Sequence, residues 1–182
     1  FGIEELATGS TIGKQDHYMS SFGNINLFKY NKDSSTDIEN IKISNEKIND
    51  FESNLLLIKV GLYRNASEIL HDQKNNLIFS KKKFNNMKNL LSFVEPAKEC
   101  LINSDYKELG KIVSETWEIK KTFSKFISNK KIDELYKYLI SLGIYGGKLL
   151  GAGSSGYFLA ICDNKIKSKI IDNLNDDDFL NV

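Results

Sequence analysis

A glycine-rich segment near the end of the chain lies between two runs of strand-forming residues. It reads Gly-Gly-Lys-Leu-Leu-Gly-Ala-Gly-Ser-Ser-Gly over residues 146–156, and the apolar run 157–162 follows at once. Residues 148–150 and 157–162 therefore predict a β-turn-β unit. Five glycines permit positive φ angles and expose backbone N–H groups, so the turn can form an anion-binding concavity. A flexible hairpin turn beside small-residue packing explains the spacing equally well.

Two common nucleotide motifs do not fit this segment. Residues 151–156 match G-x-G-x-x-G, but a dinucleotide site needs a helix directly after the glycines, and here a strand pattern follows. No segment has the P-loop pattern G-x-x-x-x-G-K-[ST]. The segment therefore predicts a phosphate-facing turn of another kind.

Strand patterns also dominate the first third of the chain. A short helix is predicted over residues 15–22, and strands over 24–30, 38–43 and 55–60. The last of these is apolar except for Lys59 and is expected to be largely buried on both faces.

The middle of the chain carries three helical stripes. They cover residues 84–101, 109–127 and 132–140. Pro96 predicts a kink or break in the first, Ser104 is a candidate N-cap for the second, and Gly143 ends the third. A helix over 164–173 and an edge strand over 179–182 complete the prediction. This order of elements favours an α+β, ferredoxin-like (split βαβ) fold with inserted antiparallel helices.

Composition narrows the class of partner. The 182 residues suit one domain, or one domain plus part of a neighbour, and their 41% apolar and 27% charged content is typical of a globular protein. A net charge of +1 disfavours nucleic acid and acidic membranes, so small molecules are the expected partners. The apolar runs are shorter than a membrane span, and two cysteines without metal-ligand spacing, Cys100 and Cys162, predict reduced thiols in the cytoplasm. The start at Phe1, without methionine, suggests a cut inside a larger protein.

Asp16 is a candidate general base. It lies in Gly-Lys-Gln-Asp-His-Tyr at residues 13–18, near the predicted start of a helix. Phosphorylation of a hydroxyl needs a group within hydrogen-bond reach that accepts the proton as the oxygen attacks. An N-cap aspartate that only stabilises the helix start is the competing interpretation.

Several segments together resemble the GHMP small-molecule kinases. Residues 13–18 with Phe-Gly-Asn-Ile-Asn at 22–26 resemble the segment that carries the catalytic aspartate of galactokinases and sugar-phosphate kinases in that superfamily. Further matches to the D-glycero-D-manno-heptose 7-phosphate kinase group are residues 61–70, 117–121, 132–136 and 146–153. The chain departs from the pattern at His17, where relatives commonly have Gln, and at Ser154 and Ser155, where they have glycines. Neither His17 nor His71 is expected to bind a metal.

The resemblance implies a kinase that uses ATP and Mg²⁺ to phosphorylate the anomeric hydroxyl of a sugar phosphate, in bacterial surface polysaccharide synthesis. Another acceptor, such as galactose or fucose, and a non-catalytic ligand-binding fragment are the alternatives. The implied catalytic residue is Asp16, and the implied substrate or phosphate contacts are Arg64, Lys14, Lys148, Gly151, Gly153, Ser154 and Ser155, with no metal ligand from the protein. Lys120 and Lys121 are further cations that could contact the phosphate of the substrate or the γ-phosphate, but they are more simply interpreted as the solvated edge of a helix.

The resemblance also implies how the chain is divided. Residues 1–50 would end a truncated N-terminal kinase domain, and residues 51–182 would form the C-terminal domain. Members of the superfamily hold ATP with an N-terminal Pro-x-x-x-Gly-Leu-Gly-Ser-Ser-Ala loop, and no segment of the 182 residues resembles it. The chain is therefore expected to be the C-terminal half, inactive alone, and a homodimer is left open.

Overall fold

The computed structural model describes residues 14–61 and 66–174, except the side chains of residues 14, 16 and 66–68. The chain divides into two compact units, Phe1–Ser44 and Asn45–Val182. The boundary predicted between residues 50 and 51 stays a prediction. Each unit is described by itself.

The first unit combines a helix with a hairpin. Its elements are α2 (Lys14–Phe22), β1 (Asn26–Tyr30) and β2 (Thr36–Asn40), and the two strands pair antiparallel from Asn26↔Asn40 to Tyr30↔Thr36. The ring of Tyr18 packs against the rings of Phe22, Phe28 and Tyr30, with centroids 5.7–6.0 Å apart. Aromatic pairs of this kind add to the area that they bury. The helix and both strands predicted for this region are confirmed.

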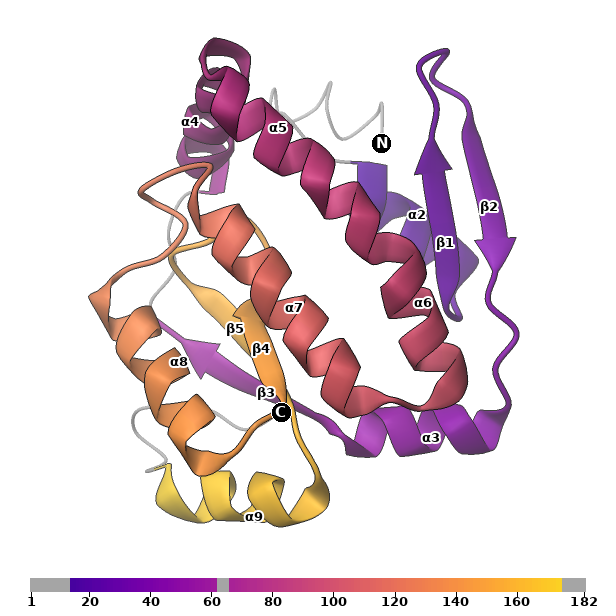
Figure 1. Ribbon diagram of the computed structural model, residues 1–182, viewed down its shortest axis with the longest axis vertical. Coiled ribbons are helices and arrows are strands. Elements are labelled where there is room, and N and C mark those ends of the chain that lie inside the picture. Colours follow the sequence, from indigo (N-terminus) through magenta and orange to yellow (C-terminus); the bar gives the residue numbers. More distant parts are fainter. Residues whose placement is uncertain (1–13, 62–65, 175–182) are drawn as a thin grey trace. The chain divides into compact units, whose positions relative to one another are not determined.

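The second unit is built on a three-stranded antiparallel sheet (Figure 1). The strands are β3 (Leu55–Val60), β4 (Gly146–Leu149) and β5 (Gly156–Ile161), in the order β3-β5-β4. The helices are α3 (Asn45–Ser53), α4 (Ala66–Phe79), α5 (Lys81–Asn89), α6 (Val94–Asn103), α7 (Tyr106–Lys121), α8 (Lys130–Leu142) and α9 (Asn164–Asn173), with a 3₁₀ turn at Leu90–Phe93. The α+β class and the β-turn-β unit are confirmed.

One face of this sheet carries the main core. Ile58, Leu149 and Phe158 are fully buried there together with Leu139 of α8 and Ile170 of α9. Because paired residues share a face, Ile58↔Phe158 and Leu149↔Phe158 place all three strands in the same apolar layer. A second cluster on α6 and α7 packs against Ile161. Lys148, paired with Leu159, lies on the face opposite to Leu149.

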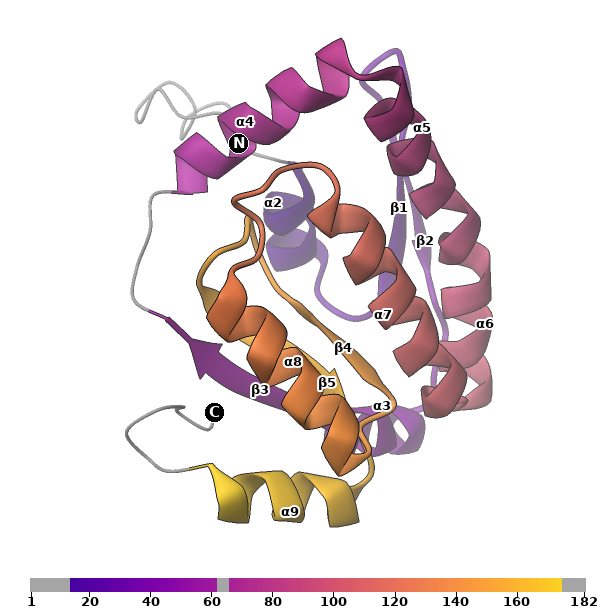
Figure 2. The ribbon, with the colours of Figure 1, turned by 60° about the vertical axis from the view of Figure 1, so that its left-hand side comes forward.

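The central helices follow the predicted order, with local corrections. Helices α5 and α6 run antiparallel to α7 in both views (Figures 1 and 2). The 3₁₀ turn directly precedes α6, whose first turn contains Pro96, so the predicted break is confirmed. The N-cap of α7 is Asp105, whose carboxylate accepts the Glu108 N–H, and not Ser104, which ends α6 at φ 58°. The second stripe was also extended too far, because α7 ends at Lys121.

Other predicted positions are confirmed or lie outside the described residues. Gly143 ends α8 at φ 103°, and α9 covers the predicted residues 164–173. Helix α3, between β2 and β3, and helix α4, after β3, were not predicted. The strand expected at residues 179–182 lies outside the described residues. In the described part of the chain, no helix combines the length and apolarity that a bilayer crossing requires.

Candidate functional site

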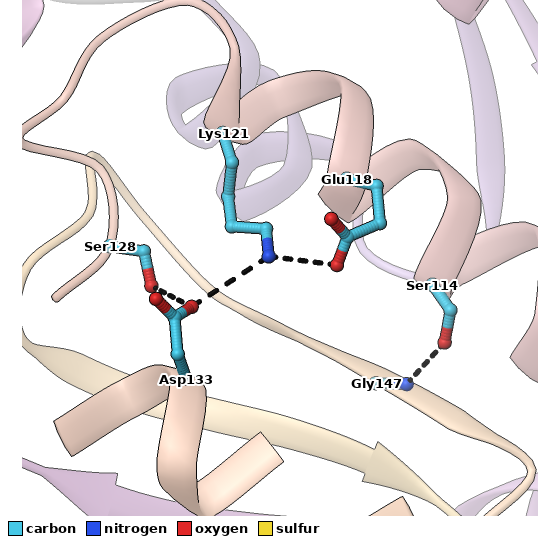
Figure 3. Close-up of polar contacts among 6 residues, drawn as sticks. All are labelled: Ser114, Glu118, Lys121, Ser128, Asp133 and Gly147. Carbon is cyan, nitrogen blue, oxygen red and sulfur yellow. Dashed lines mark hydrogen bonds and ion pairs between the residues drawn. The ribbon is translucent and has the colours of Figure 1, made fainter. Parts of the chain in front are cut away.

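Helix α7 lies directly along strand β4 because two glycines meet there. A Cβ on Gly146 would lie 1.8 Å from the carbonyl oxygen of Gly110, so no larger residue fits without separating the helix from the strand. One turn further on, Ser114 Oγ accepts the Gly147 N–H at 3.1 Å (Figure 3). The end of α7 is thereby positioned beside the turn that follows β4.

That turn is the glycine-rich loop, residues 150–155 between β4 and β5. Its base is closed by the Leu150 N–H, which donates to the Tyr157 carbonyl at 2.8 Å. Within it, Gly151, Gly153 and Ser154 have φ angles of 72°, 126° and 68°. A Cβ on Gly153 would lie 2.7 Å from the backbone of Ile127, so both the conformation and the close approach require glycine.

Side chains from three segments hold the carbonyl groups of the loop. Lys120 Nζ of α7 donates to the Gly151 carbonyl, and Gln73 Nε2 of α4 donates to the Ala152 carbonyl at 3.1 Å. Asn129 Nδ2 donates to the Ser154 carbonyl at 3.2 Å, while its Oδ1 caps α8 through the Ile132 N–H. These contacts fix the orientation of the loop's peptide planes.

Most backbone N–H groups at the start of the loop, unlike its carbonyl groups, have no hydrogen-bond partner among the described residues. Ser154 N–H donates to the Ile127 carbonyl at 2.8 Å. Within the described ranges, the N–H groups of Gly151, Ala152 and Gly153 have no acceptor. In a trans peptide the C=O and the following N–H point in opposite directions. Anchoring the Gly151 and Ala152 carbonyls therefore turns the Ala152 and Gly153 N–H groups away from the anchors, where adjacent amides can bind an anion.

Two lysines beside the loop share an unusual environment. Lys120, at the end of α7, and Lys148, on β4, are both half-buried. Burial lowers the pKa of Lys120 to about 8, with a further contribution from the charge of Lys148. Burial also lowers the pKa of Lys148. Neither ammonium is paired with a carboxylate among the side chains that the structure describes.

Lys121, one residue later on α7, is the opposite case. Its ammonium lies 2.8 Å from Glu118 Oε1 and 3.7 Å from Asp133 Oδ1, and Asp133 also accepts a hydrogen bond from Ser128 Oγ (Figure 3). These contacts tie α7 to the start of α8. The charge of Lys121 is thus compensated by two carboxylates, whereas no carboxylate with a described side chain compensates that of Lys120.

The structure brings together five of the predicted site residues. Lys148 lies on β4, and Gly151, Gly153, Ser154 and Ser155 form the loop that follows it. Ser154 is buried, and its N–H donates to the carbonyl of Ile127, which lies outside the loop.

The structure does not describe the side chains of the other three predicted residues. Arg64 lies outside the described residues. Lys14 and Asp16 belong to α2 in the first unit, and their side chains also lie outside the described part. Their roles, and a shared site with the glycine-rich loop, stay predictions.

Sequence reasoning missed three residues that hold the loop. Lys120 was considered as a phosphate contact and as a solvated helix edge, and its hydrogen bond to the Gly151 carbonyl was not predicted. Gln73 and Asn129 have no local signal, because their acceptors lie 79 and 25 residues away in the sequence. Among the described residues, no group of three or more His, Cys, Asp or Glu could hold a metal ion.

Comparisons with known proteins agree with this description. The family model "GHMP kinases C terminal" matches residues 97–177. The chain is 27% identical over 171 residues to D-glycero-alpha-D-manno-heptose 7-phosphate kinase of Campylobacter jejuni, covering 94% of this chain and 50% of that protein.

Two solved structures resemble the whole chain. A putative sugar kinase from Campylobacter jejuni is 26% identical with a TM-score of 0.66, covering 100% of this chain and 51% of that one. The mevalonate kinase of L. major in complex with R-mevalonate has a TM-score of 0.71 at 16% identity, covering 97% of this chain and 54% of that one, and supports the fold alone. The chain thus spans about half the length of these relatives. The predicted resemblance to the GHMP kinases is confirmed, and residues 97–177 match the model of their C-terminal family.

Proposed function

We propose that this chain is part of an ATP-dependent sugar kinase that phosphorylates the anomeric hydroxyl of a sugar phosphate, with D-glycero-D-manno-heptose 7-phosphate as the leading acceptor. The observation that carries the proposal is the glycine-rich loop. Its carbonyls are held by Lys120, Gln73 and Asn129, and three consecutive N–H groups are left without an acceptor in the described part of the chain. The 27% identity to a heptose 7-phosphate kinase supports the choice of acceptor.

In this proposal the N–H groups of the glycine-rich loop stabilise the negative charge of a phosphate group. Backbone N–H groups that are already oriented need no reorganisation when negative charge develops, and phosphoryl transfer depends largely on such positioning. The anchors matter because they hold the amides in this orientation. A bound Mg²⁺ would neutralise the charge of the triphosphate, and an ion that is held mainly by phosphates needs few protein ligands.

Asp16 is the proposed general base. Its motif, Gly-x-x-Asp-x-Tyr at residues 13–18, supports the role, and α2 begins at Lys14, so Asp16 lies in the first turn of that helix. A carboxylate with an ordinary pKa is ionised at neutral pH and can accept the proton of the attacking hydroxyl. Lys14 and Arg64 are proposed as further contacts to phosphate oxygens.

The proposed reaction belongs to the cytoplasm, where ATP is supplied, and its product would feed nucleotide-activated heptose for surface polysaccharide. The principal ATP loop of the superfamily does not occur in the 182 residues. We therefore propose that the chain acts together with that loop.

An ADP-release assay tests this proposal. It uses the longest natural form of the protein that contains these residues, with heptose 7-phosphate, galactose and mevalonate as acceptors. We expect turnover with the heptose phosphate and a loss of at least about a hundredfold in Asp16→Ala, in line with the usual contribution of a general base. Asp172→Ala, an exposed carboxylate of α9, is the matched control and should stay active. Full turnover in Asp16→Ala would refute the proposed base, and turnover with galactose alone would refute the acceptor.

A further inference from the structure

Lys120 and Lys148 place two like charges next to the glycine-rich loop without a compensating carboxylate in the described residues. Lys120 is the last-turn lysine of α7 that donates to the Gly151 carbonyl, and Lys148 lies on the β4 strand that leads into the loop. No residue described by the structure accepts a hydrogen bond from the Lys148 ammonium. Each of the two therefore keeps donors available, because an ammonium carries three N–H groups and Lys120 uses one.

This arrangement costs folding free energy in the absence of a ligand. Half-buried ammonium groups lose hydration, and like charges at short range disfavour each other. Burial lowers the pKa of both lysines, and the charge of Lys148 lowers the pKa of Lys120 further. Strained electrostatics of this kind cluster at functional sites.

A structural role explains only part of the pattern. Anchoring the Gly151 carbonyl accounts for the position of Lys120, but it gives no reason for a second unpaired ammonium on β4. The neighbouring Lys121 shows that carboxylates are available here, since Glu118 and Asp133 both pair with it. Lys120 and Lys148 have no such partner within the described ranges. A dianion would supply the missing charge, and phosphate oxygens would accept the remaining N–H groups.

We propose that Lys120 and Lys148 together form a subsite for the phosphate dianion of a bound ligand. The binding of phosphate itself does not depend on the proposed kinase activity, and the inference rests on that activity only for the molecule that carries the phosphate. Either of two ligands could supply this phosphate group: ATP, through its triphosphate, or the phosphorylated sugar acceptor. The subsite is distinct from the Ala152 and Gly153 amides, which point away from the Lys120 anchor.

Titration of the full chain with inorganic phosphate tests the subsite directly. Calorimetry gives the dissociation constant for the parent chain and for Lys120→Met, Lys148→Met and the double variant. Methionine keeps most of the apolar stem and removes the charge. One charge-assisted contact is worth about 1.5–3 kcal/mol, so each single change should weaken binding by about tenfold to a hundredfold. Lys121→Met, the matched control from the same helix, should bind phosphate with the parent affinity.

A second readout needs no variant. In NMR spectra of the parent chain, phosphate should shift the side-chain Hε and Cε resonances of Lys120 and Lys148, and the pKa of both should rise towards that of an ordinary lysine. Unmoved resonances, or a parent affinity in both Lys→Met variants, would overturn the proposal. An equal loss in Lys121→Met would overturn it as well, because a general charge effect would then explain the binding.

The carrier is identified by two further titrations. One compares Mg-ATP in the parent chain and the variants, and the other compares a heptose 7-phosphate with the same sugar lacking the phosphate. Variants that weaken only Mg-ATP assign the subsite to the nucleotide, and variants that weaken only the sugar phosphate assign it to the acceptor. If phosphate binds as expected but the intact protein transfers no phosphoryl group, the proposed function fails and the subsite stands. If turnover is intact and phosphate does not bind, the subsite fails alone.

Discussion

Replacing Lys120 by methionine should stabilise the protein. At neutral pH the ammonium is charged in the folded and in the unfolded chain, but only the folded chain places it half-buried next to Lys148. Its pKa falls from 10.5 to about 8 on folding, and at about 1.4 kcal/mol per pKa unit the charged form costs about 3 kcal/mol as an upper bound. Solvent screening and the lost hydrogen bond to Gly151 each reduce the gain. We expect a net increase of about 1–2 kcal/mol in the free energy of unfolding.

The pH dependence provides the sharper test. Below pH 8 the folded and unfolded chains both hold the proton of Lys120, and the full cost is present. Between pH 8 and 10.5 the folded chain releases this proton first, so the unfolded chain binds more protons and stability rises with pH. The stability advantage of Lys120→Met should therefore be greatest below pH 8 and shrink towards pH 10.5.

Urea unfolding followed by tryptophan fluorescence measures both effects. Trp117 is the single tryptophan and has 0% exposure, so its emission reports unfolding of the core around α7. Lys121→Met is the control, since it removes an ammonium with two carboxylate partners and should cost up to about 1 kcal/mol. A loss of stability in Lys120→Met at pH 7, or an advantage over the parent chain that does not change between pH 7 and 10, would refute the reasoning.

Four further changes test other parts of the second unit. Gly146→Ala should lower the free energy of unfolding in urea by about 3 kcal/mol or more, because its Cβ would lie 1.8 Å from the Gly110 carbonyl oxygen. Gly151→Ala, with φ 72° and open space around the Cβ, should cost only about 1 kcal/mol, and similar losses in the two variants would contradict this. Asp105→Ala removes the N-cap of α7 and should lower the free energy of unfolding by about 1 kcal/mol. An unchanged urea midpoint would show that Asp105 does not stabilise the start of this helix. Gln73→Leu should release the Ala152 carbonyl and so weaken the binding of Mg-ATP or phosphate measured by calorimetry, while the melting temperature changes little. An unchanged affinity would show that this hydrogen bond does not support anion binding by the glycine-rich loop.

The sequence predicted elements well where a single face is buried. Strand β5 carries apolar residues that fill the main core, and α8 and α9 have apolar stripes and clear ends. Strand β3 was located correctly, but its predicted burial on both faces was wrong. It is an edge strand that buries Leu56, Ile58 and Val60 on one face, while the residues of its other face are half-buried or exposed. Helix α3 was missed because Asn45–Ser53 is short and polar and buries no residue, so it has no stripe to detect. Helix α4 was missed for a similar reason, since few apolar positions interrupt its polar residues. The N-cap of α7 was misplaced by one residue because Ser104 and Asp105 are both good caps.

The candidate site was predicted only in its local part. Glycines reveal their backbone freedom in the sequence, and the β-turn-β pattern located the loop between two strands. The environment of Lys120 depends on a carbonyl 31 residues away and on Lys148 across the helix-strand contact, so it follows from tertiary packing alone. Long-range contacts of this kind follow no periodic pattern in the sequence, so residue types alone do not predict them.

The three carbonyl anchors have a consequence for folding during synthesis. Gln73, Lys120 and Asn129 leave the ribosome 79, 31 and 25 residues before the carbonyls that they hold. The donors are thus in place first, and the loop can adopt its binding shape only after α4, α7 and the start of α8 have docked. A nascent chain would then gain affinity for phosphate only after these helices have docked. Phosphate binding could therefore report that the tertiary structure of this unit is complete.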